Sequence, residues 1–414
     1  MSDCDCGSQG AALKPLEEAV ELMLARARPI SGSERVATAE ALDRVLAEAQ
    51  TSPITVPAWD NSAMDGYAIR TADLSEGQNR LRVTQRIPAG SSGEPLGAGE
   101  AARIFTGAPV PPGADAVVMQ EFCERDGDTL IVKRPPAPGA NIRRAGEDIE
   151  TGAEVLAAGT RLAPQHLGLA ASVGIATLPV KRRLKVAIFS SGDELVMPGE
   201  TLAPGQIYNS NHFTLSGLLR RLGCEIIDLG QVEDNFEATR DALARGAGEA
   251  DLVLASGGVS VGEEDHVKPA VEALGTLDLW KIAIRPGKPV AFGHIGETPF
   301  IGAPGNPVSL FVTFCLFMRP FILRQQGVSG DLVPPMLSAE AAFDWPKPDK
   351  RREFVRARLE TGPDGAARVS VYPSRSSGVL SSVVWANGLV VIREGQVVRR
   401  GERVDFLPFS ELLQ

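Results

Sequence analysis

At 414 residues and 43% hydrophobic, the chain is long enough to build several hydrophobic cores, which predicts roughly two to four domains. Its formal charge of −10 argues against nucleic acid as a partner, because duplex binding depends on Lys and Arg that neutralise phosphates. No apolar run reaches the roughly 20 residues that span a bilayer, and the start of the chain lacks a signal-peptide pattern, so we expect no membrane partner and a cytoplasmic location. Five scattered cysteines indicate reduced thiols.

The first half of the chain predicts two bodies. Apolar residues at helical spacing predict an amphipathic helix over Pro15–Arg28, and a second helix is expected over Ala39–Leu46. The Ala- and Leu-rich segment before residue 180 is expected to pair with these helices, giving a helical linker domain of residues 12–51 and 152–180. Residues 52–151 consist of short apolar runs between Gly, Pro and Asp, which is typical of a β-rich domain inserted into the linker.

The second half alternates strands with helices. The expected strands are Lys185–Phe189, Glu225–Leu229, Asp251–Ala255 and Leu277–Ile284. The expected helices are His212–Leu222, Phe236–Ala247, His266–Leu274 and Val308–Gln326. This alternation predicts a doubly wound α/β domain over residues 181–330. Residues 335–414 predict a smaller β domain that depends on its neighbours for stability.

Chemistry-bearing residues follow the predicted strands of the α/β domain. In a parallel sheet, ligands collect at the carboxyl ends of the strands, where helix N-termini point unpaired N–H groups. The residues at these positions are Ser190, Gly192 and Glu194; Asp234; Ser256, Gly257, Gly258 and Asp265; and Pro304, Asn306 and Pro307.

Glycine turns attract phosphate, whereas carboxylates at the same edge repel it. A Mg²⁺ ion held by Glu194, Asp234 and Asp265 resolves the conflict, because Mg²⁺ prefers carboxylate and phosphate oxygens. The alternative is that these acids cap helices or pair with surface cations. For a single acid we would prefer this structural explanation. For three acids at the ends of successive strands we favour the metal site. The sequence therefore predicts a site for a phosphorylated ligand held through a divalent cation.

Cations flank a turn late in the α/β domain. Residues 280–289 alternate apolar and polar side chains, which would leave Lys281 and Arg285 on one face of a strand. Such a face can bind an oxyanion. A solvated strand edge that carries lysine against aggregation explains the same pattern equally well.

The β-rich domain contains three turn-rich motifs that carry polar side chains. The first places two carboxylates, Asp60 and Asp65, at one loop, and the others add the Thr106 hydroxyl, the guanidiniums of Arg143 and Arg144, and further acids that include Asp148. Turn formation explains these motifs first, and a catalytic role comes second.

In combination, these motifs resemble the molybdopterin molybdenumtransferase family, which comprises the MoeA proteins and the gephyrin E domain, from about Pro15 to Leu407. The segments that carry the resemblance are Asp60–Ala68, Thr106–Pro109, Gly146–Ile149, Phe189–Leu195, Ser256–Asp265 and Pro304–Ser309. The resemblance implies that adenylylated molybdopterin and molybdate react in a Mg²⁺-dependent step, that AMP leaves, and that molybdenum is placed on the pterin dithiolene. It also implies a MogA-like α/β domain, a C-terminal β-barrel, and a homodimer whose site lies between the α/β domain of one subunit and the β-rich domain of the other.

The resemblance also assigns roles to single residues. The matched residues are Glu194, Asp234 and Asp265 around the nucleotide and the cation; Asp60 and Asp148 for the transfer, with Thr106 and Arg143 beside them; and Lys281 and Arg285 for molybdate, with Arg356 and Ser377 as helpers. The family commonly has Lys-Pro-Gly-Lys where this chain has Arg285-Pro286-Gly287-Lys288, which exchanges a compact ammonium for a planar guanidinium. The family also commonly has Gly-Ser-Gly where this chain has Ser376-Ser377-Gly378.

Two other functions stay open at this point. A molybdopterin adenylyltransferase uses a similar α/β domain with the same Ser-Gly-Gly turn, but generally lacks the other domains. A binding or scaffold function is the third hypothesis, since the gephyrin relatives also anchor receptors. An adenylyltransferase and the proteins that mature molybdoenzymes are candidate partners. Molybdate and tungstate, both tetrahedral dianions, are not distinguished.

Overall fold

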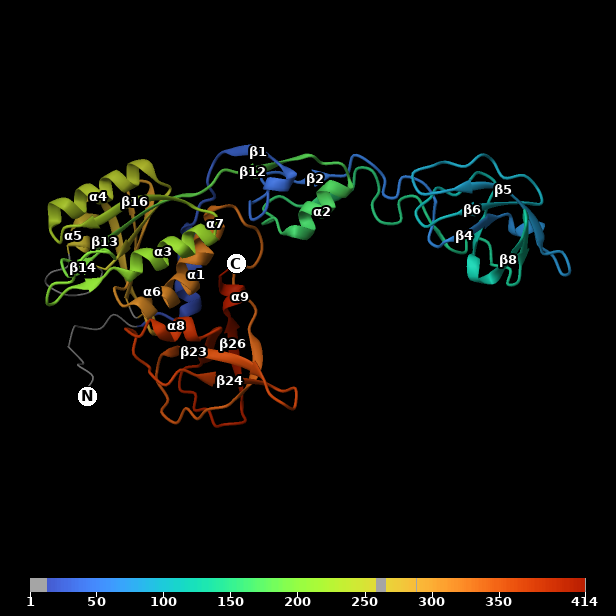
Figure 1. Cartoon of the computed structure of the whole chain (residues 1–414). Helices are drawn as coiled ribbons and strands as arrows, with labels where there is room; N and C mark the ends of the chain where they lie inside the picture. Colours follow the sequence, from blue (N-terminus) through green and yellow to red (C-terminus); the bar gives the residue numbers. More distant parts are fainter. Residues whose placement is uncertain (1–12, 258–265, 288, 414) are drawn as a thin grey trace.

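The structure is a computed structural model that describes residues 13–257, 266–287 and 289–413. The molecule is elongated (Figure 1). The α/β domain and a β-barrel pack together at one end, a slender linker follows, and the β-rich domain lies alone at the far end.

A mixed six-stranded sheet forms the α/β domain, in the order β16-β13-β17-β21-β20-β18. Its strands are β13 (Lys185–Ser191), β16 (Glu225–Val232), β17 (Leu252–Ser256), β18 (Gly275–Lys281), β20 (Pro289–Ile295) and β21 (Thr298–Ala303). The first four strands in spatial order are parallel, and β20 and β18 are antiparallel to their neighbours. The structure confirms the doubly wound α/β alternation; the hairpin β20–β21 was not predicted.

Alternating side chains of each strand face two separate cores. On β13, Val186 and Ile188 belong to one buried cluster, whereas Ala187 and Phe189 belong to the other, as the two-residue period of a strand requires. The second face is covered by α4 (Phe236–Glu249) and α5 (Val267–Leu274). The first face is covered by α3 (Ser210–Arg221) and the helices that follow β21.

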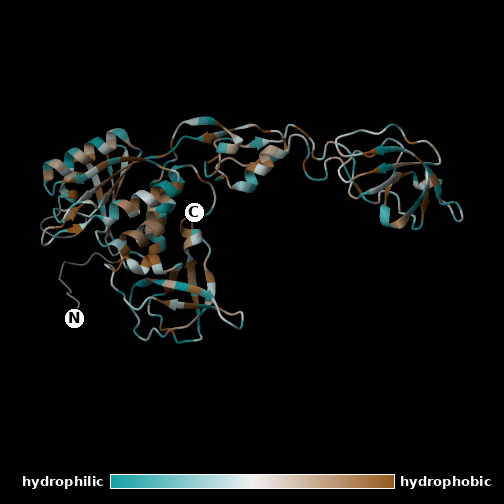
Figure 2. Ribbon diagram, in the orientation of Figure 1, coloured by the Kyte–Doolittle hydropathy of each residue, from teal (hydrophilic) through white to brown (hydrophobic). Residues whose placement is uncertain are grey.

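The segment Pro307–Gln325 is the central helix of this first core. It comprises α6 (Pro307–Thr313), a π turn (Phe314–Met318) and α7 (Arg319–Gln325). By length and composition it is apolar enough to cross a membrane, yet 83% of its most apolar window is buried inside the protein. Figure 2 shows the hydrophobic colouring of this region, which explains the apolar sequence as a core helix.

The N-terminal helix α1 (Leu16–Arg26) belongs with the α/β core, so its predicted pairing with the linker is wrong. Its fully buried Ala19 and Met23 pack into the cluster that contains α6 and α7. The broad apolar surface of that cluster buries the apolar face of α1.

The helix predicted over Ala39–Leu46 is also wrong. The segment begins with a 3-10 turn over Thr38–Glu40, which does not continue as a helix. Asp43 then adopts a left-handed conformation with φ 61°. The backbone of Leu46 then pairs with distant residues, donating to Thr160 O at 2.9 Å. Tertiary pairing overrides the local helical preference of this segment.

The linker is mixed rather than helical. It contains the strand pairs β1 (Ser33–Ala37) with β12 (Thr177–Lys181) and β2 (Gln50–Thr51) with β11 (Glu154–Leu156), and one helix, α2 (Pro164–Ser172). In the β-rich domain the sheet order is β7-β4-β6-β5-β9-β8. These strands are β4 (Gly66–Ile69), β5 (Arg80–Ile87), β6 (Glu100–Ile104), β7 (Ala116–Met119), β8 (Cys123–Asp126) and β9 (Thr129–Val132).

The C-terminal domain is a closed barrel, as predicted. Its strands are β22 (Leu337–Ala341), β23 (Arg352–Thr361), β24 (Ala367–Val371), β25 (Gly388–Ile392) and β26 (Arg403–Pro408). They pair in the order β23-β24-β22-β26-β25, and β25 pairs with β23 again to close the barrel. Two short helices, α8 (Ser381–Trp385) and α9 (Phe409–Leu412), flank it. The strand β19 (Ile284–Arg285) pairs with β23 and joins the barrel to the α/β domain.

Candidate functional site

Three glycine turns meet at the carboxyl edge of the sheet, after β13, β17 and β21. A Cβ atom on Gly257, whose φ is +92°, would lie 2.8 Å from the carbonyl oxygen of Ser191. A Cβ atom on Gly305 would lie 3.9 Å from the Cα of Gly257. Bare backbone from three strands therefore comes together without side chains between them, which is the arrangement that lets backbone N–H groups approach a phosphate.

Hydrogen bonds fix the turn that follows β13. The Ser191 hydroxyl donates to Asp234 Oδ1 at 3.0 Å, which ties this turn to the end of β16. The Gln231 side-chain amide donates to Gly192 O at 3.0 Å. The Glu194 carboxylate folds back over the turn, since a Cβ atom on Gly192 would lie 2.7 Å from Glu194 Oε2. Glu194 and Asp234, two of the three acids predicted for this edge, therefore both lie at the turn that contains Gly192.

The other predicted residues of this edge have distinct places. Ser190 and Ser256 are buried register partners on β13 and β17. Pro304 is buried, Asn306 is exposed, and Pro307 is the first residue of α6. The predicted Gly258 and Asp265 lie outside the described residues.

Glu194 and Asp234 are the described acids that would hold a Mg²⁺ ion at this edge, and only together with oxygens of a bound phosphate. Among the described residues, no group of three or more His, Cys, Asp or Glu side chains is arranged to hold a metal by itself. Glu194 and Asp234 nevertheless offer two carboxylates beside phosphate-type turns. One or two carboxylates completed by substrate oxygens is the usual Mg²⁺ arrangement.

The predicted strand carrying both Lys281 and Arg285 on one face is wrong. β18 ends at Lys281, and Arg285 lies on the separate strand β19. The chain before α1 causes the break, because Lys14 bridges Ile282 and its carbonyl oxygen accepts from Ala283 N–H at 2.8 Å. Lys281 is half-buried at the end of its strand.

Two acids of the barrel hold Arg285. Its Nη1 donates to Asp349 Oδ2 at 3.2 Å, and its Nε lies 3.9 Å from Glu353 Oε1. Burial acts to raise the pKa of Asp349, but hydrogen bonds from the Arg351 side chain and backbone, together with Arg285, outweigh it and lower the pKa to about 2. Asp349 is therefore ionised at neutral pH and fixes one side of the Arg285 guanidinium.

The pH dependence of stability will show this lowered pKa. Because the folded pKa lies below the usual 3.8, the ionised Asp349 stabilises the fold above about pH 4, and this contribution disappears as pH falls towards 2. We expect wild type to exceed Asp349→Asn in urea midpoint at pH 7, with the difference shrinking between pH 4 and 2. A difference that stays constant over that range would contradict the assignment.

The turn after Arg285 packs directly on α6. Gly287 has φ +102°, and a Cβ atom there would lie 2.6 Å from Thr313 Oγ1. From the other side, Val308 N–H at the start of α6 donates to Ser377 O at 3.0 Å. The segments that carry Arg285 and Ser377, two of the residues predicted for molybdate, therefore contact the two ends of one helix.

Gly287→Ala will test this close packing. The methyl group would meet Thr313 in a backbone conformation that L side chains rarely adopt, so we expect a loss of about 1–3 kcal/mol in unfolding free energy. Urea unfolding measures this loss. The control is Gly296→Ala, because Gly296 also has a positive φ but has open space where its Cβ would lie. Equal losses in both variants would show that the contact with α6 contributes nothing.

Arg356 is buried on the outer face of β23, against α8 and the loop before Ser377, instead of at an open oxyanion site; its neighbours Val355 and Ala357 face the barrel core. It is 2% exposed and donates to Ser382 Oγ at 2.9 Å, Ser374 O at 2.8 Å and Ser376 O at 3.1 Å. Its guanidinium therefore shapes the loop that carries Ser377.

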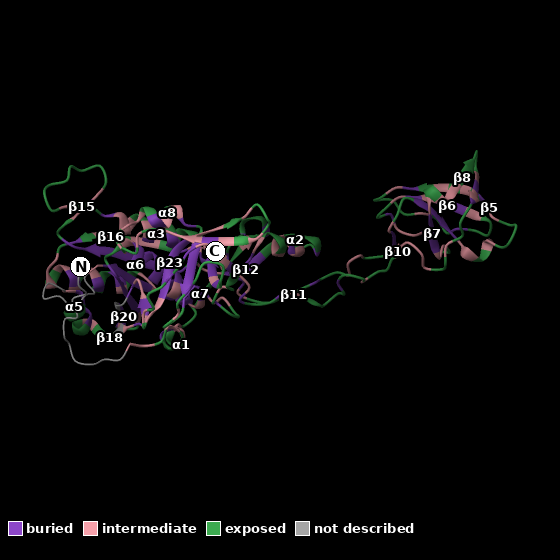
Figure 3. Cartoon of the chain, turned by 90° about the horizontal axis from the view of Figure 1, so that it is seen from below, coloured by how far each residue is buried: buried purple, intermediate pink, exposed green. Residues whose placement is uncertain are grey.

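The predicted residues of the β-rich domain gather where the two connecting segments enter it, at the short strands β3 (Asn61–Ser62) and β10 (Ile142–Arg143) (Figure 3). Asp60 accepts from Ala145 N–H at 2.9 Å and from Arg144 Nη1 at 2.5 Å. The Ala145 hydrogen bond is the main cause that lowers the pKa of Asp60, and Arg144 adds to it. Sequence reasoning counted both arginines of this motif but assigned a site role only to Arg143.

Asp65, the second carboxylate of the Asp60–Ala68 loop, was given no site role from the sequence, but it positions Thr106. Its Oδ1 accepts from both the backbone N–H and the hydroxyl of Thr106, each at 2.8 Å. The fourth predicted residue of this domain, Asp148, is exposed, and its N–H donates to Val56 O at 3.1 Å.

Within one chain these two sets of residues stay apart. The glycine turns and Arg285 lie in the α/β and barrel end, whereas Asp60, Thr106, Arg143 and Asp148 lie at the opposite end, beyond the linker (Figures 1 and 3).

Comparison with known proteins covers nearly the whole chain. Residues 14–174 match the MoeA N-terminal region (domain I and II), residues 187–324 match a probable molybdopterin binding domain, and residues 338–409 match the MoeA C-terminal region (domain IV). The molybdopterin molybdenumtransferase of Haemophilus influenzae is 42% identical over 401 residues, covering 96% of this chain and 99% of the relative. Molybdopterin molybdenumtransferase 2 of Mycobacterium tuberculosis is 38% identical, with 92% and 95% covered.

Solved structures agree. The crystal structure of the molybdopterin biosynthesis moeA protein from Pyrococcus horikoshii OT3 superposes with a TM-score of 0.81 at 33% identity, covering 96% of this chain and 100% of that one. The similarity thus extends across all four bodies. This chain belongs to the MoeA family.

Proposed function

We propose that this protein is a Mg²⁺-dependent molybdopterin molybdenumtransferase, which places molybdenum from molybdate onto adenylylated molybdopterin and releases AMP. Relatives of that name match over nearly their full length. The observation that carries the proposal is that α6 joins the two predicted binding regions, one at each of its ends. The glycine turn at Gly305 leads into this helix, and the turn after Arg285 packs on its Thr313.

Glu194 and Asp234, with Asp265, would hold the Mg²⁺ ion. The ion, when bound, offsets the negative charge of the pyrophosphate. The backbone turns after β13, β17 and β21 bind phosphate oxygens, while Lys281 and Arg285 attract the molybdate dianion. An oxygen of molybdate forms a new bond to a phosphorus of the phosphoanhydride as the P–O–P bond breaks, and AMP leaves. The two dithiolene sulfurs take the places of two molybdate oxygens: one has passed to phosphorus, and the other leaves as water with the thiol protons. The protein contributes mainly positioning and electrostatics.

The proposal includes a homodimer, because one chain keeps Asp60 and Asp148 far from the glycine turns. An apolar groove of about 600 Å³ supports self-association. It is lined by Phe213, Phe311 and Phe409, and the side chain of Phe213 is 53% exposed. Exposed apolar surface of this kind is typical of an interface. The dimer would place the β-rich domain of one subunit against the α/β domain of the other.

A reconstituted assay tests the function. Purified protein is mixed with adenylylated molybdopterin, molybdate and Mg²⁺, and AMP is measured with and without molybdate. We expect AMP release that requires molybdate and Mg²⁺. Consumption of ATP with molybdopterin would instead identify an adenylyltransferase, and neither reaction would favour a scaffold. Parallel titrations of molybdate and tungstate measure oxyanion preference. A cytoplasmic location and docking of an adenylyltransferase belong to the same proposal.

A further inference from the structure

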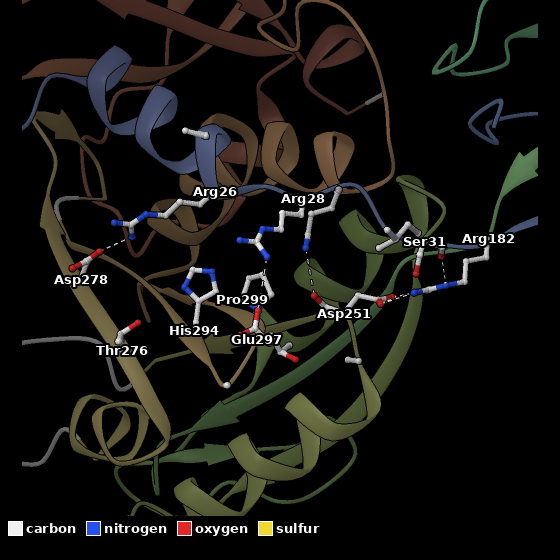
Figure 4. Close-up of a pocket in the computed structure, with 16 residues that line it drawn as sticks. Arg26, Arg28, Ser31, Arg182, Asp251, Thr276, Asp278, His294, Glu297 and Pro299 are labelled. Carbon is white, nitrogen blue, oxygen red and sulfur yellow. Dashed lines mark hydrogen bonds and ion pairs between the residues drawn. The ribbon is translucent and has the colours of Figure 1, made fainter. Parts of the chain in front are cut away.

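The two edges of the α/β sheet differ in what they offer to an anion. Where the parallel strands begin, a cavity of about 830 Å³ is lined by Arg26, Arg28 and Arg182 (Figure 4). Each of these arginines pairs with an acid of the same wall, so the charges of that cavity balance within the protein. The glycine edge at the other end of the strands instead presents backbone N–H groups, and one of them is oriented by a side chain outside the residues assigned above.

That side chain is Asn211, which lies in the first turn of α3 and reaches the glycine turn that follows β21. Its Nδ2 donates to Gly305 O at 2.7 Å, the short end of the usual range for an amide donor. The chain just before α3 is tied to the turn that follows β13, because Ile207 N–H donates to Glu194 O at 2.8 Å. Asn211 therefore connects the Glu194 turn, through the start of α3, with the Gly305 turn.

The Asn211 hydrogen bond fixes the direction of the peptide group between Gly305 and Asn306. This peptide is trans, and in a trans peptide the C=O and N–H bonds point in opposite directions. Because the carbonyl oxygen faces α3, the Asn306 N–H points away from α3. No residue in the described part of the chain accepts a hydrogen bond from this N–H, and both Gly305 and Asn306 are exposed. The Asn306 N–H is therefore available to an oxygen of a ligand.

Stability does not explain the amide of Asn211. Its Oδ1 atom is buried and makes no hydrogen bond, which costs free energy. Leucine, whose side chain branches at the same carbon, would avoid that cost. Because Gly305 is exposed, water can replace the donor that leucine would remove. A polar side chain that is kept at such a cost is expected where function requires one of its atoms, and here that atom is Nδ2.

We propose that Asn211 is a positioning residue for phosphate binding: it orients the Asn306 N–H towards a phosphate oxygen of the adenylylated substrate. The inference rests on the proposed function, which supplies that phosphate. The Gly305 turn lies beside the Gly257 turn, with 3.9 Å between the Cα of Gly257 and a Cβ built on Gly305, so both turns can contact oxygens of one phosphate group. Asn211 itself stays bonded to Gly305 and acts through the turn.

AMP with Mg²⁺ is the probe for the test, since AMP carries a phosphate of the substrate. Proline has no N–H, so the only amide hydrogens between Pro304 and Pro307 belong to Gly305 and Asn306. Rapid-mixing hydrogen exchange on the full-length protein measures them. We expect AMP to slow their exchange in wild type. Asn211→Leu should abolish this protection and raise the Kd for AMP, measured by calorimetry, about tenfold, while its urea midpoint does not fall.

Steady-state kinetics and a matched variant separate positioning from a general structural effect. In Asn211→Leu, the KM for adenylylated molybdopterin should rise about tenfold, whereas the KM for molybdate should stay at its wild-type value. Asn211→Ser, which is too short to reach Gly305, repeats the comparison with a smaller side chain. The control is Asn79→Leu, which removes another half-buried asparagine whose amide donates to Val132 O at 3.0 Å in the β-rich domain. It should leave AMP binding and exchange unchanged.

Three results would overturn the inference: a wild type that binds no AMP, AMP binding that does not slow exchange at Gly305 and Asn306, or equally tight AMP binding in wild type and Asn211→Leu. Failure of the proposed function gives a different result. A protein that shows the expected protection but releases no AMP from adenylylated molybdopterin retains the role of Asn211 in phosphate binding and loses the transfer reaction. Active transfer that Asn211→Leu leaves unchanged does the reverse.

Discussion

Asp60→Asn and Glu194→Gln will each lower AMP release at least about 10²-fold, and a heterodimer of the two inactive chains will recover about half of the wild-type rate. Each site of the proposed dimer combines the β-rich domain of one subunit with the α/β domain of the other. In the heterodimer, both changes fall in one site, and the second site is intact. Two affinity tags on co-expressed chains allow the heterodimer to be purified and its AMP release measured.

A heterodimer of Asp60→Asn with Asp148→Asn is the matched control. Both changes then affect β-rich domains, so each site contains one damaged half, and no recovery is expected. If the first heterodimer stays as inactive as this control, the site does not form between subunits. If the single variants retain full activity, the roles assigned to the two acids are wrong.

Arg285→Ala is expected to raise the KM for molybdate about 10- to 100-fold with a smaller change in kcat, because a charge-assisted contact to the dianion is lost. Arg285→Lys keeps the charge but not the planar fork, so its KM should fall between wild type and the Ala variant. The readout is AMP release as a function of molybdate concentration.

Stability separates this binding role from a structural one. Removing Arg285 leaves Asp349 with Arg351, and Glu353 still accepts from Trp345 Nε1 at 2.8 Å. Neither acid is left without a partner, so we expect only a modest fall in the urea midpoint. Arg393→Ala, which removes a barrel arginine paired with Asp405 at 2.8 Å, is the control and should not change the KM. An unchanged KM in Arg285→Ala would remove this residue from the molybdate site.

Local patterns explain what the sequence could predict. The strand before Gly192 and the turn at Gly257 are recognisable because a buried strand and its terminal turn are encoded by neighbouring residues. The parallel strands then bring those turns together by topology alone, so the glycine edge follows from the fold class.

Long-range contacts explain what it could not. The segment 39–46 has helical composition, but the backbone N–H groups of Asp43 and Leu46 donate to Leu162 and Thr160, more than 100 positions later, which no local pattern reveals. The break between Lys281 and Arg285 depends on Lys14, and the ion pair of Asp60 depends on Arg144, 84 positions away. Choosing Arg144 over its neighbour requires the register of β3 with β10.

The linker strands have a consequence for chain topology. Thr51 and Glu154 are antiparallel register partners on β2 and β11, so the chain leaves for the β-rich domain and returns from it at adjacent points. The whole β-rich domain is therefore an insertion between the two paired strands of a hairpin. A short turn between these two residues would close that hairpin, and the intervening hundred or so residues form a cassette that can be excised or transplanted with both ends rejoined.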